Sequence, residues 1–200
     1  MTTILLARHG ETDWNRDNRF QGHADPLLNE TGRAQAAELS KTLAGEALAA
    51  VYSSPLRRAF ETAQIVAARH GLEPVPLDAL REVDVGSWQG LTRTEIEARF
   101  PEQFARWLDY KDGWDDGESY EEMGRRVIAG LLELAAGHAG ERILAVTHGG
   151  PVRAVYAVAD EITHAEARRR GPVVANAFVA EFTVQDGNFR RVREPNCRSA

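Results

Sequence analysis

Short apolar runs alternate with helix-patterned segments along most of the chain. Runs at Thr3–Ala7, Ala49–Ser54 and Arg142–Thr147 each stop at a polar loop, which is typical of buried strands. A helix is expected from Thr31 to about Leu43, because Thr31 can cap its first amides. A second helix is expected over 55–71, with a proline at its first position and a glycine at its end. The pattern therefore predicts strand, helix, strand, helix in sequence.

Two pairs of residues predict further helix starts in the middle of the chain. Thr92 stands three residues before Glu95, and Ser119 stands three residues before Glu122. At this spacing the hydroxyl and the carboxylate satisfy each other's free backbone amides, which is the capping-box arrangement. We expect a helix after each pair.

The last part of the chain predicts a β-hairpin. Strands near 177–184 and 189–192 flank Asp186-Gly187, a dipeptide suited to a turn with positive φ. Strands joined by helices require a mostly parallel sheet covered on both faces. The sequence thus predicts an α/β fold, a three-layer α/β/α sandwich with a mostly parallel central sheet. One domain is expected over residues 1–200, with a small helical lid insertion over about 89–118.

Composition narrows the classes of partner. The formal net charge is −6 and the pI is near 5.6, which argues against a nucleic-acid surface because phosphate backbones need a positive footprint. Cys197 is the one cysteine, so no internal disulfide is expected. The segment before Arg8 contains too few apolar residues to form a signal peptide or a membrane span. We expect a cytoplasmic protein with a small-molecule partner, no membrane association and no nucleic acid.

Unusual polar residues follow three of the predicted strands. They are Arg-His-Gly at 8–10, the stretch from Ser53 to the arginine pair at 57–58, and His-Gly-Gly at 148–150. Ligands of such sheets bind beyond the carboxyl ends of the strands, so these groups should meet in one crevice. Two arginines match phosphate oxygens, and a helix N-terminus with glycines lets backbone amides approach them. The constellation predicts a phosphate site.

Each of these signals is weak when it stands alone. A histidine after a strand, such as His9 or His148, is more often a structural hydrogen-bonding residue than a catalyst. An arginine pair at a helix start is usually solvated surface charge, and we keep that interpretation for Arg57. The prediction depends on the convergence of all three segments.

Five stretches of the sequence resemble one family in order and spacing. They are LLARHGETDWN followed by FQG, then YSSPLRRAFETA, LREVDVGSWQG, DGESYEEMGRRV and VTHGGPVR. Together they resemble the histidine phosphatase superfamily, which includes the phosphoglycerate mutases and many small phosphatases. The resemblance extends from residue 4 to about residue 180 and implies this family's fold and chemistry.

The resemblance implies a role for each matching residue. His9 would be the phosphorylated nucleophile, with Arg8, Arg58 and His148 around the phosphate and Asn15 on the same rim. These residues are the expected core of the site.

Further assignments follow from the same resemblance. Glu82 matches the acid that protonates the leaving oxygen, with Asp84 as its competitor. Gln21 and Gly22 match a segment lining the substrate entrance, and Gly149 matches a backbone amide contact.

The implied reaction is two successive phosphoryl transfers, first to His9 and then to water. His9 must attack as the neutral imidazole, and the flanking arginines should favour that form. His148 could be cationic once phosphate is bound. Arginines and histidines supply the positive charge, so no metal and no cofactor are expected. The remaining histidines lack metal-ligand spacing and are expected at the surface.

Several alternatives remain open. A 2,3-bisphosphoglycerate-dependent phosphoglycerate mutase would use the same site, but such mutases typically continue after the acid with Arg-His-Tyr, whereas residues 82–86 read Glu-Val-Asp-Val-Gly. An α-ribazole phosphatase, a catalytically dead relative and a metal-dependent hydrolase are further alternatives. A homodimer is possible, and the cluster at 168–170 is expected to be a solvated helix end. Trp107 is expected in the core, and Trp14 and Trp88 as pocket walls.

Overall fold

The computed structural model describes residues 1–171 and 174–193, so Cys197 lies outside the described residues. Six strands form one mixed sheet in the order β3-β2-β4-β1-β5-β6. Neighbours from β3 to β1 pair in parallel, and β5 and β6 add two antiparallel pairings at the other edge. The strands are β1 (Thr2–Arg8), β2 (Leu48–Ser53), β3 (Pro74–Pro76), β4 (Arg142–Thr147), β5 (Val179–Gln185) and β6 (Asn188–Arg193).

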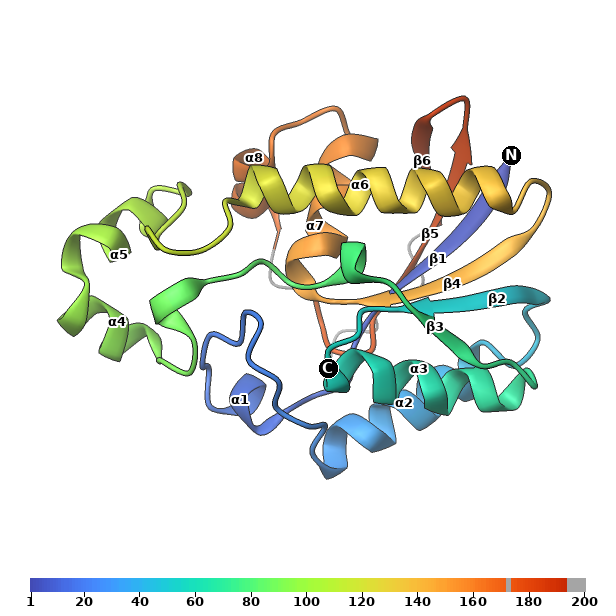
Figure 1. The fold of residues 1–200 in the computed structure, drawn as a ribbon, viewed down its shortest axis with the longest axis horizontal. Coiled ribbons are helices and arrows are strands. Elements are labelled where there is room, and N and C mark those ends of the chain that lie inside the picture. Colours follow the sequence, from blue (N-terminus) through green and yellow to red (C-terminus); the bar gives the residue numbers. More distant parts are fainter. Residues whose placement is uncertain (172–173, 194–200) are drawn as a thin grey trace.

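Helices cover both faces of the sheet (Figure 1). The side chains of β1 alternate between the two layers: Leu5 packs with α2 and α3, whereas Ile4 packs with α6 and α7. The predicted three-layer α/β/α sandwich is therefore confirmed. The helices are α1 (Asp13–Arg16), α2 (Glu30–Thr42), α3 (Arg57–Arg69), α4 (Arg93–Arg99), α5 (Pro101–Leu108), α6 (Tyr120–Gly137), α7 (Gly149–Ala159) and α8 (His164–Arg170), with short 3-10 turns at Asp78–Leu80 and Gly86–Trp88.

The register of the sheet brings the three polar segments to one edge. In the parallel pair β1–β4, Arg8 lies opposite Thr147, and in β2–β4, Ser53 lies opposite Val146. The chain leaves all three strands at the same end, because parallel strands share the direction of their carboxyl ends. Residues 9–10, 54–58 and 148–150 therefore emerge side by side.

Helix starts differ in detail from the sequence pattern. Asn29, not Thr31, caps α2, and its Oδ1 accepts a hydrogen bond of 2.8 Å from the Gly32 amide. Helix α3 begins at Arg57 rather than Pro55, since the Oδ1 of Asp25 accepts from the Arg57 amide at 2.6 Å. A distant side chain thus satisfies an amide that the local sequence leaves open.

The other local predictions agree with the structure. Capping boxes form at Thr92 and Ser119, which begin α4 and α6. Asp186 and Gly187 both have positive φ, 51° and 78°, in the turn between β5 and β6. Strand β3 is an element that the sequence pattern did not predict, because its two prolines argue against a strand. It lies at a sheet edge, where a missing amide donor is tolerated.

The segment predicted as a lid, 89–118, contains α4 and α5 and packs on Trp88. The Trp88 ring is fully buried and meets the rings of Phe20, Trp107 and Trp114 at 5.4, 6.3 and 5.5 Å. Edge-to-face arrangements of this kind stabilise aromatic clusters. Trp88 is therefore the centre of an aromatic core, and its predicted place as a pocket wall is wrong.

Arg168 is also placed differently from expectation. Its guanidinium lies 4.6 Å from the centre of the Tyr120 ring and 5.3 Å from that of Trp107, and it donates to the carbonyl oxygens of Trp107 and Lys111 at 3.2 Å. Cation–π contacts and backbone hydrogen bonds thus attach α8 to the segment around α5. Of the predicted solvated cluster, Arg169 and Arg170 are exposed, whereas Arg168 is not.

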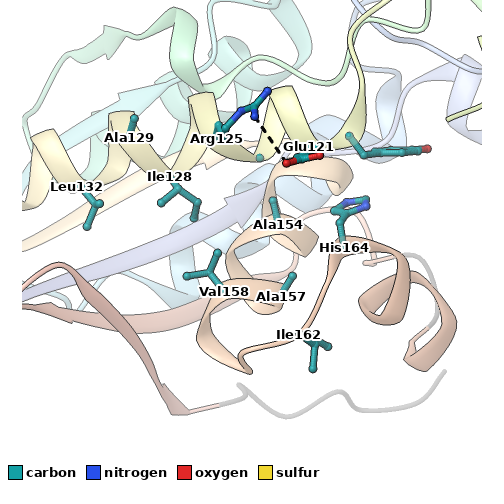
Figure 2. Close-up of a pocket in the computed structure, with 12 residues that line it drawn as sticks. Glu121, Arg125, Ile128, Ala129, Leu132, Ala154, Ala157, Val158, Ile162 and His164 are labelled. Carbon is teal, nitrogen blue, oxygen red and sulfur yellow. Dashed lines mark ion pairs between the residues drawn. The ribbon is translucent and has the colours of Figure 1, made fainter. Parts of the chain in front are cut away.

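A mostly apolar cavity of about 420 Å³ lies between α6, α7 and α8 (Figure 2). Ile128, Val158 and Ile162 are among the residues that line it, and Arg125, which also lines it, pairs with Glu121 at 3.6 Å. Within the described part of the chain, no helix is long and apolar enough to cross a membrane.

Removing the Trp88 ring should destabilise the fold strongly. We expect Trp88→Ala to lower the free energy of unfolding by about 3–5 kcal/mol, because a fully buried indole leaves a cavity. Urea unfolding measures this change. Leu108→Ala, at a side chain that is 58% exposed, is the control and should change it by less than about 1 kcal/mol. Equal effects of the two substitutions would contradict the assignment of Trp88 as a packing centre.

Candidate active site

A pocket of about 180 Å³ opens at the carboxyl ends of β1 and β4. Eight of the nine predicted site residues line it, and His148 lies directly behind His9, with its ring centre 5.1 Å from that of His9. The structure therefore brings the predicted residues together. Those that line the pocket are Arg8, His9, Asn15, Gln21, Gly22, Arg58, Glu82 and Gly149.

His9 is held at both its backbone and its ring. Its amide donates to the Thr147 carbonyl at 3.0 Å, and its own carbonyl accepts from the Ala177 amide and the Asn176 side chain, both at 3.1 Å. Its Nδ1 lies 2.6 Å from the Gly10 carbonyl oxygen. Since a carbonyl only accepts, we assign the proton to Nδ1, which leaves a lone pair on Nε2. Burial, Arg58 and Arg8 lower the pKa of His9 well below its ordinary value.

His148 is fully buried and lies at the N-terminus of α7. Its Nε2 is 2.8 Å from the Ser54 hydroxyl oxygen, so the residue that ends the second polar segment orients this ring. Burial, followed by Arg58 and His9, lowers the pKa of His148 well below 6.5. The geometry thus favours a neutral His148 in the protein by itself, as it does for His9.

Two buried guanidinium groups flank the histidines. Arg58 donates to the carbonyl oxygens of Ala24 and Gly22 at 2.7 and 2.9 Å, and Arg8 donates to the carbonyl of Val174. Burial lowers the pKa of each arginine to about 10, so both stay cationic at neutral pH. The Nε of each is buried and has no hydrogen-bond partner among the described residues. Buried donors of this kind are suited to an anionic ligand.

The position of Glu82 separates it from its competitor Asp84. Glu82 lines the pocket, and its carboxylate accepts from the amides of Val83 at 3.0 Å and Gly150 at 3.3 Å. Asp84 does not line the pocket, and its Oδ1 accepts from the Gly86 amide at 3.0 Å. The ring of His23, predicted at the surface, is half-buried and bonds the Glu82 carbonyl at 2.8 Å. Of the two acids, Glu82 can reach a bound substrate.

The rim residues are positioned by local contacts. Asn15 is fixed because its Oδ1 accepts from the amide and hydroxyl of Thr12, both at 3.1 Å. Gly22 has a φ of +51°, and a Cβ there would lie 2.7 Å from Val85 Cγ2. The Oε1 of Gln21 is buried without a partner among the described residues. Arg57 is exposed and outside the pocket, as expected for surface charge. Trp14 is half-buried and does not line this pocket, so its predicted place as a pocket wall is wrong.

Several lining residues were not predicted. Phe20 and Arg153 lie within the stretches that carried the resemblance, so their positions in FQG and VTHGGPVR could have marked them. Tyr120 lies within DGESYEEMGRRV, another of these stretches, and reaches the pocket from the first turn of α6. The others are Arg19, Val83, Val85 and Gly150. Among residues 1–171 and 174–193, no group of three or more histidine, cysteine or acidic side chains could hold a metal ion.

The family model of the histidine phosphatase superfamily (branch 1) matches residues 4–196 of this chain. The chain belongs to this superfamily. The family predicted from the sequence is therefore confirmed, and the predicted site residues that line the pocket lie within the matched range.

Three similar proteins place the chain within the superfamily. Phosphoserine phosphatase 1 of Hydrogenobacter thermophilus is 37% identical over 158 residues, which cover 78% of this chain and 75% of that protein. Phosphoglycerate mutase-like protein 4 of Arabidopsis thaliana is 39% identical over 190 residues, covering 92% and 80%. The structure of YhfR from Bacillus stearothermophilus superposes with a TM-score of 0.90 at 32% identity, covering 97% of this chain and 96% of that one.

The two buried histidines should make stability fall in acid. Their lowered pKa values mean that the folded protein stays unprotonated where the unfolded chain, with a histidine pKa near 6.5, binds protons. The unfolded state then binds more protons, so stability is full above about pH 6.5 and falls below it, by up to about 1.4 kcal/mol per pH unit for each histidine.

Denaturant unfolding at pH 6 and pH 5 measures this slope. We expect His9→Asn to reduce the difference between the two pH values relative to wild type, because one of the two neutral imidazoles is removed. His70→Asn, at the end of α3 and outside the pocket, should leave the slope unchanged. A wild-type slope in His9→Asn would contradict a neutral, buried His9.

Proposed function

We propose that this protein is a metal-independent phosphatase that hydrolyses a small phosphorylated metabolite through a phosphohistidine on His9. One observation carries the proposal: an imidazole with a lowered pKa and a free Nε2 lone pair shares the pocket with two buried guanidinium groups whose Nε donors have no partner in the described chain. A nucleophile surrounded by fixed cations is what phosphoryl transfer requires. Similarity to phosphatases of the superfamily supports the same conclusion.

In the first step, Nε2 of His9 attacks phosphorus as the ester P–O bond breaks. Arg8 and Arg58 hold the equatorial oxygens, and Gly149, the first residue of α7, lines the pocket with them. Glu82 gives its proton to the leaving oxygen, so the product departs as an alcohol. The Nδ1–H of His9 keeps its bond to the Gly10 carbonyl and stabilises the positive charge that the ring gains.

In the second step, water replaces the departed alcohol. The Glu82 carboxylate takes a proton from the water as its oxygen attacks phosphorus, and the N–P bond breaks. Nε2 recovers its lone pair, and inorganic phosphate leaves. His148, held by Ser54, packs edge to face against the His9 ring.

A phosphoglycerate mutase is the second candidate, because the mutase-like protein of Arabidopsis is 39% identical. It would return the phosphoryl group to another hydroxyl of the substrate instead of to water. The pocket, about 180 Å³, is smaller than the roughly 300 Å³ at which small-molecule sites usually begin, and this favours a compact monophosphate over a bisphosphate. An α-ribazole phosphatase belongs to the same reaction class, so a substrate panel decides it.

Other aspects of the function stay predictions. A cytoplasmic location, a homodimer and a lid role for residues 89–118 are expected from the sequence. In the proposed mechanism the positive charge comes from protein side chains, and no metal or other cofactor takes part.

Neighbouring arginines provide a matched test of the proposed site. With p-nitrophenyl phosphate, we expect His9→Ala to abolish turnover and Arg58→Met to lower kcat/KM by about 10²–10³-fold, since a fixed cation at the transferring group is lost. Arg57→Met should retain activity because that side chain is exposed. Wild-type activity should survive a strong chelator, and acid-labile phosphate should be trapped on wild type but not on His9→Ala.

Two outcomes would overturn the proposal. Undiminished turnover in His9→Ala would refute the nucleophile, and activity that a chelator removes and a divalent metal restores would refute metal independence. The mutase is tested by supplying 3-phosphoglycerate with catalytic 2,3-bisphosphoglycerate. Efficient formation of 2-phosphoglycerate instead of free phosphate would identify a mutase.

The position of the Glu82 carboxyl depends on a glycine. A Cβ at residue 150 would lie 2.3 Å from Glu82 Oε1, so Gly150→Ala must displace the carboxylate. We expect kcat for glycerol 3-phosphate to fall by about 10²-fold or more, because its alkoxide leaves only with a proton. The loss for p-nitrophenyl phosphate should be much smaller, because p-nitrophenolate leaves unprotonated.

Gly124→Ala is the control, since a Cβ there meets only the Ala154 Cβ at 3.7 Å. It should leave both substrates at wild-type rates. Equal losses on the two substrates in Gly150→Ala would show that the glycine serves the pocket as a whole and does not position the acid.

A further inference from the structure

Arg126 is a charged side chain that the proposed mechanism does not use. It lies in the second turn of α6 and does not line the active-site pocket. Its Nε and Nη2 donate to the two carboxylate oxygens of Glu118 at 2.9 and 2.6 Å, and only 26% and 20% of the two side chains are exposed. A two-pronged pair of this kind fixes the plane of the guanidinium. The Glu118 amide also donates to the Asp84 carbonyl at 2.9 Å, so the pair contacts the segment that follows Glu82.

The segment that leads to Glu82 is bound by side chains through every one of its carbonyl oxygens. Residues 78–82 contain one 3-10 turn and no strand, so backbone pairing can satisfy few of these oxygens. Arg126 donates to four of them at 2.9 to 3.3 Å, namely those of Asp78, Ala79, Arg81 and Glu82. The Thr147 hydroxyl donates to the fifth, that of Leu80, at 2.6 Å. The path of this segment is therefore set by side chains from α6 and β4.

A glycine brings α6 close enough for these contacts. Gly130 lies one turn after Arg126, and a Cβ there would lie 2.5 Å from the Cβ of Ala79. Carbon atoms in contact are normally about 3.5–4.0 Å apart, so a larger residue at 130 would push the helix away from the turn. The backbone of α6 therefore packs directly on the turn whose carbonyl oxygens Arg126 binds.

Glu82 is held at both its backbone and its side chain. Its carbonyl accepts from Arg126 at 3.3 Å and from the ring Nε2 of His23 at 2.8 Å. Its carboxylate accepts from the Gly150 amide, in the first turn of α7, at 3.3 Å. Proton transfer requires that acid and acceptor approach to about 2.6–3.2 Å. A shift of the backbone at residue 82 would therefore change the rate of proton transfer.

We propose that Arg126, paired with Glu118, is a positioning residue that places the Glu82 carboxyl at the leaving oxygen of the substrate. Arg126 acts through the backbone of residues 78–82, because its own side chain does not line the pocket. The inference rests on the proposed phosphatase function and adds a requirement to its proton transfer. The acid has a fixed place only while α6 holds the carbonyl oxygens that precede it.

Substrates that differ in their leaving group separate a positioning role from a merely structural one. The alkoxide of glycerol 3-phosphate leaves only with a proton, p-nitrophenolate leaves without one, and phenolate is intermediate. The ratio kcat/KM reports the transfer to His9 and excludes the later hydrolysis of the phosphohistidine. For Arg126→Met we expect kcat/KM for glycerol 3-phosphate to fall about 10- to 100-fold, as a displacement of about 1 Å costs. The loss should be smaller for phenyl phosphate and smallest for p-nitrophenyl phosphate.

The neighbouring arginine provides a matched control. Arg125 is on the same helix, is 69% exposed and pairs with Glu121 at 3.6 Å, so Arg125→Met should keep wild-type rates on all three substrates. Arg126→Lys keeps a cation beside Glu118 but has a single nitrogen, so it should restore part of the activity on glycerol 3-phosphate. Glu118→Gln should give the same order of losses at smaller size. Inhibition by inorganic phosphate should stay close to wild type in all of these variants.

A double variant tests whether Arg126 acts through the acid. Glu82→Gln should itself lose far more activity on glycerol 3-phosphate than on p-nitrophenyl phosphate. Adding Arg126→Met to Glu82→Gln should cause little further loss, because two changes that remove the same function are not additive. Equal losses on the two substrates in Glu82→Gln would refute Glu82 as the acid, and the positioning role with it.

The remaining outcomes separate this inference from the function on which it rests. If wild type hydrolyses none of the three compounds, the proposed function itself fails. The phosphatase stands and the positioning role is refuted if Arg126→Met loses nothing, loses all three activities equally, or adds its full loss to that of Glu82→Gln. Urea unfolding checks that each variant is folded in the assay. If Arg126→Met is not, Arg126→Lys and Glu118→Gln decide by the same criteria.

Discussion

Parallel pairing of β4 with both β1 and β2 is the constraint on which the pocket depends. Arg8 lies opposite Thr147 and Ser53 opposite Val146, so each strand releases its polar segment at the same level. Side chains alternate between the two faces of a strand. A shift of one residue in either pairing would therefore exchange the side chains that face one helical layer with those that face the other. The apolar run of β4, buried from Ile143 to Thr147, makes such a shift costly because it packs against both helical layers.

The electrostatics of the pocket follow from burial at that edge. Two guanidinium groups are removed from water there, and backbone carbonyls of residues 22, 24 and 174 compensate part of the cost. Two imidazoles share the space, and burial, followed by the neighbouring cations, lowers their pKa values so that they stay neutral. In the proposed mechanism, the cations that bind the phosphate thus also help to keep the His9 imidazole neutral.

The sequence predicted most of this arrangement because the convergence of strand ends is a topological rule, and His9 and His148 each follow a strand directly. It left Glu82 and Asp84 as competitors, since two acids two residues apart differ only in the contacts that a loop makes. Trp88 and Arg168 were placed wrongly, because burial among distant rings is not encoded in the local pattern. For a similar reason Asn29, and not Thr31 as predicted, caps α2: the conformation of the preceding loop decides which side chain reaches the free amide.

The carbonyl of His9 is bound by Asn176 and Ala177, and Asn176 lies 167 residues further along the chain. During synthesis β1 leaves the ribosome well before the groups that fix the His9 backbone. Loop closure over such a separation must await the pairing of β5 with β1. A chain synthesised only as far as α7 can thus collapse around β1 and β4 before the backbone of His9, the proposed nucleophile, is held by residues 176 and 177.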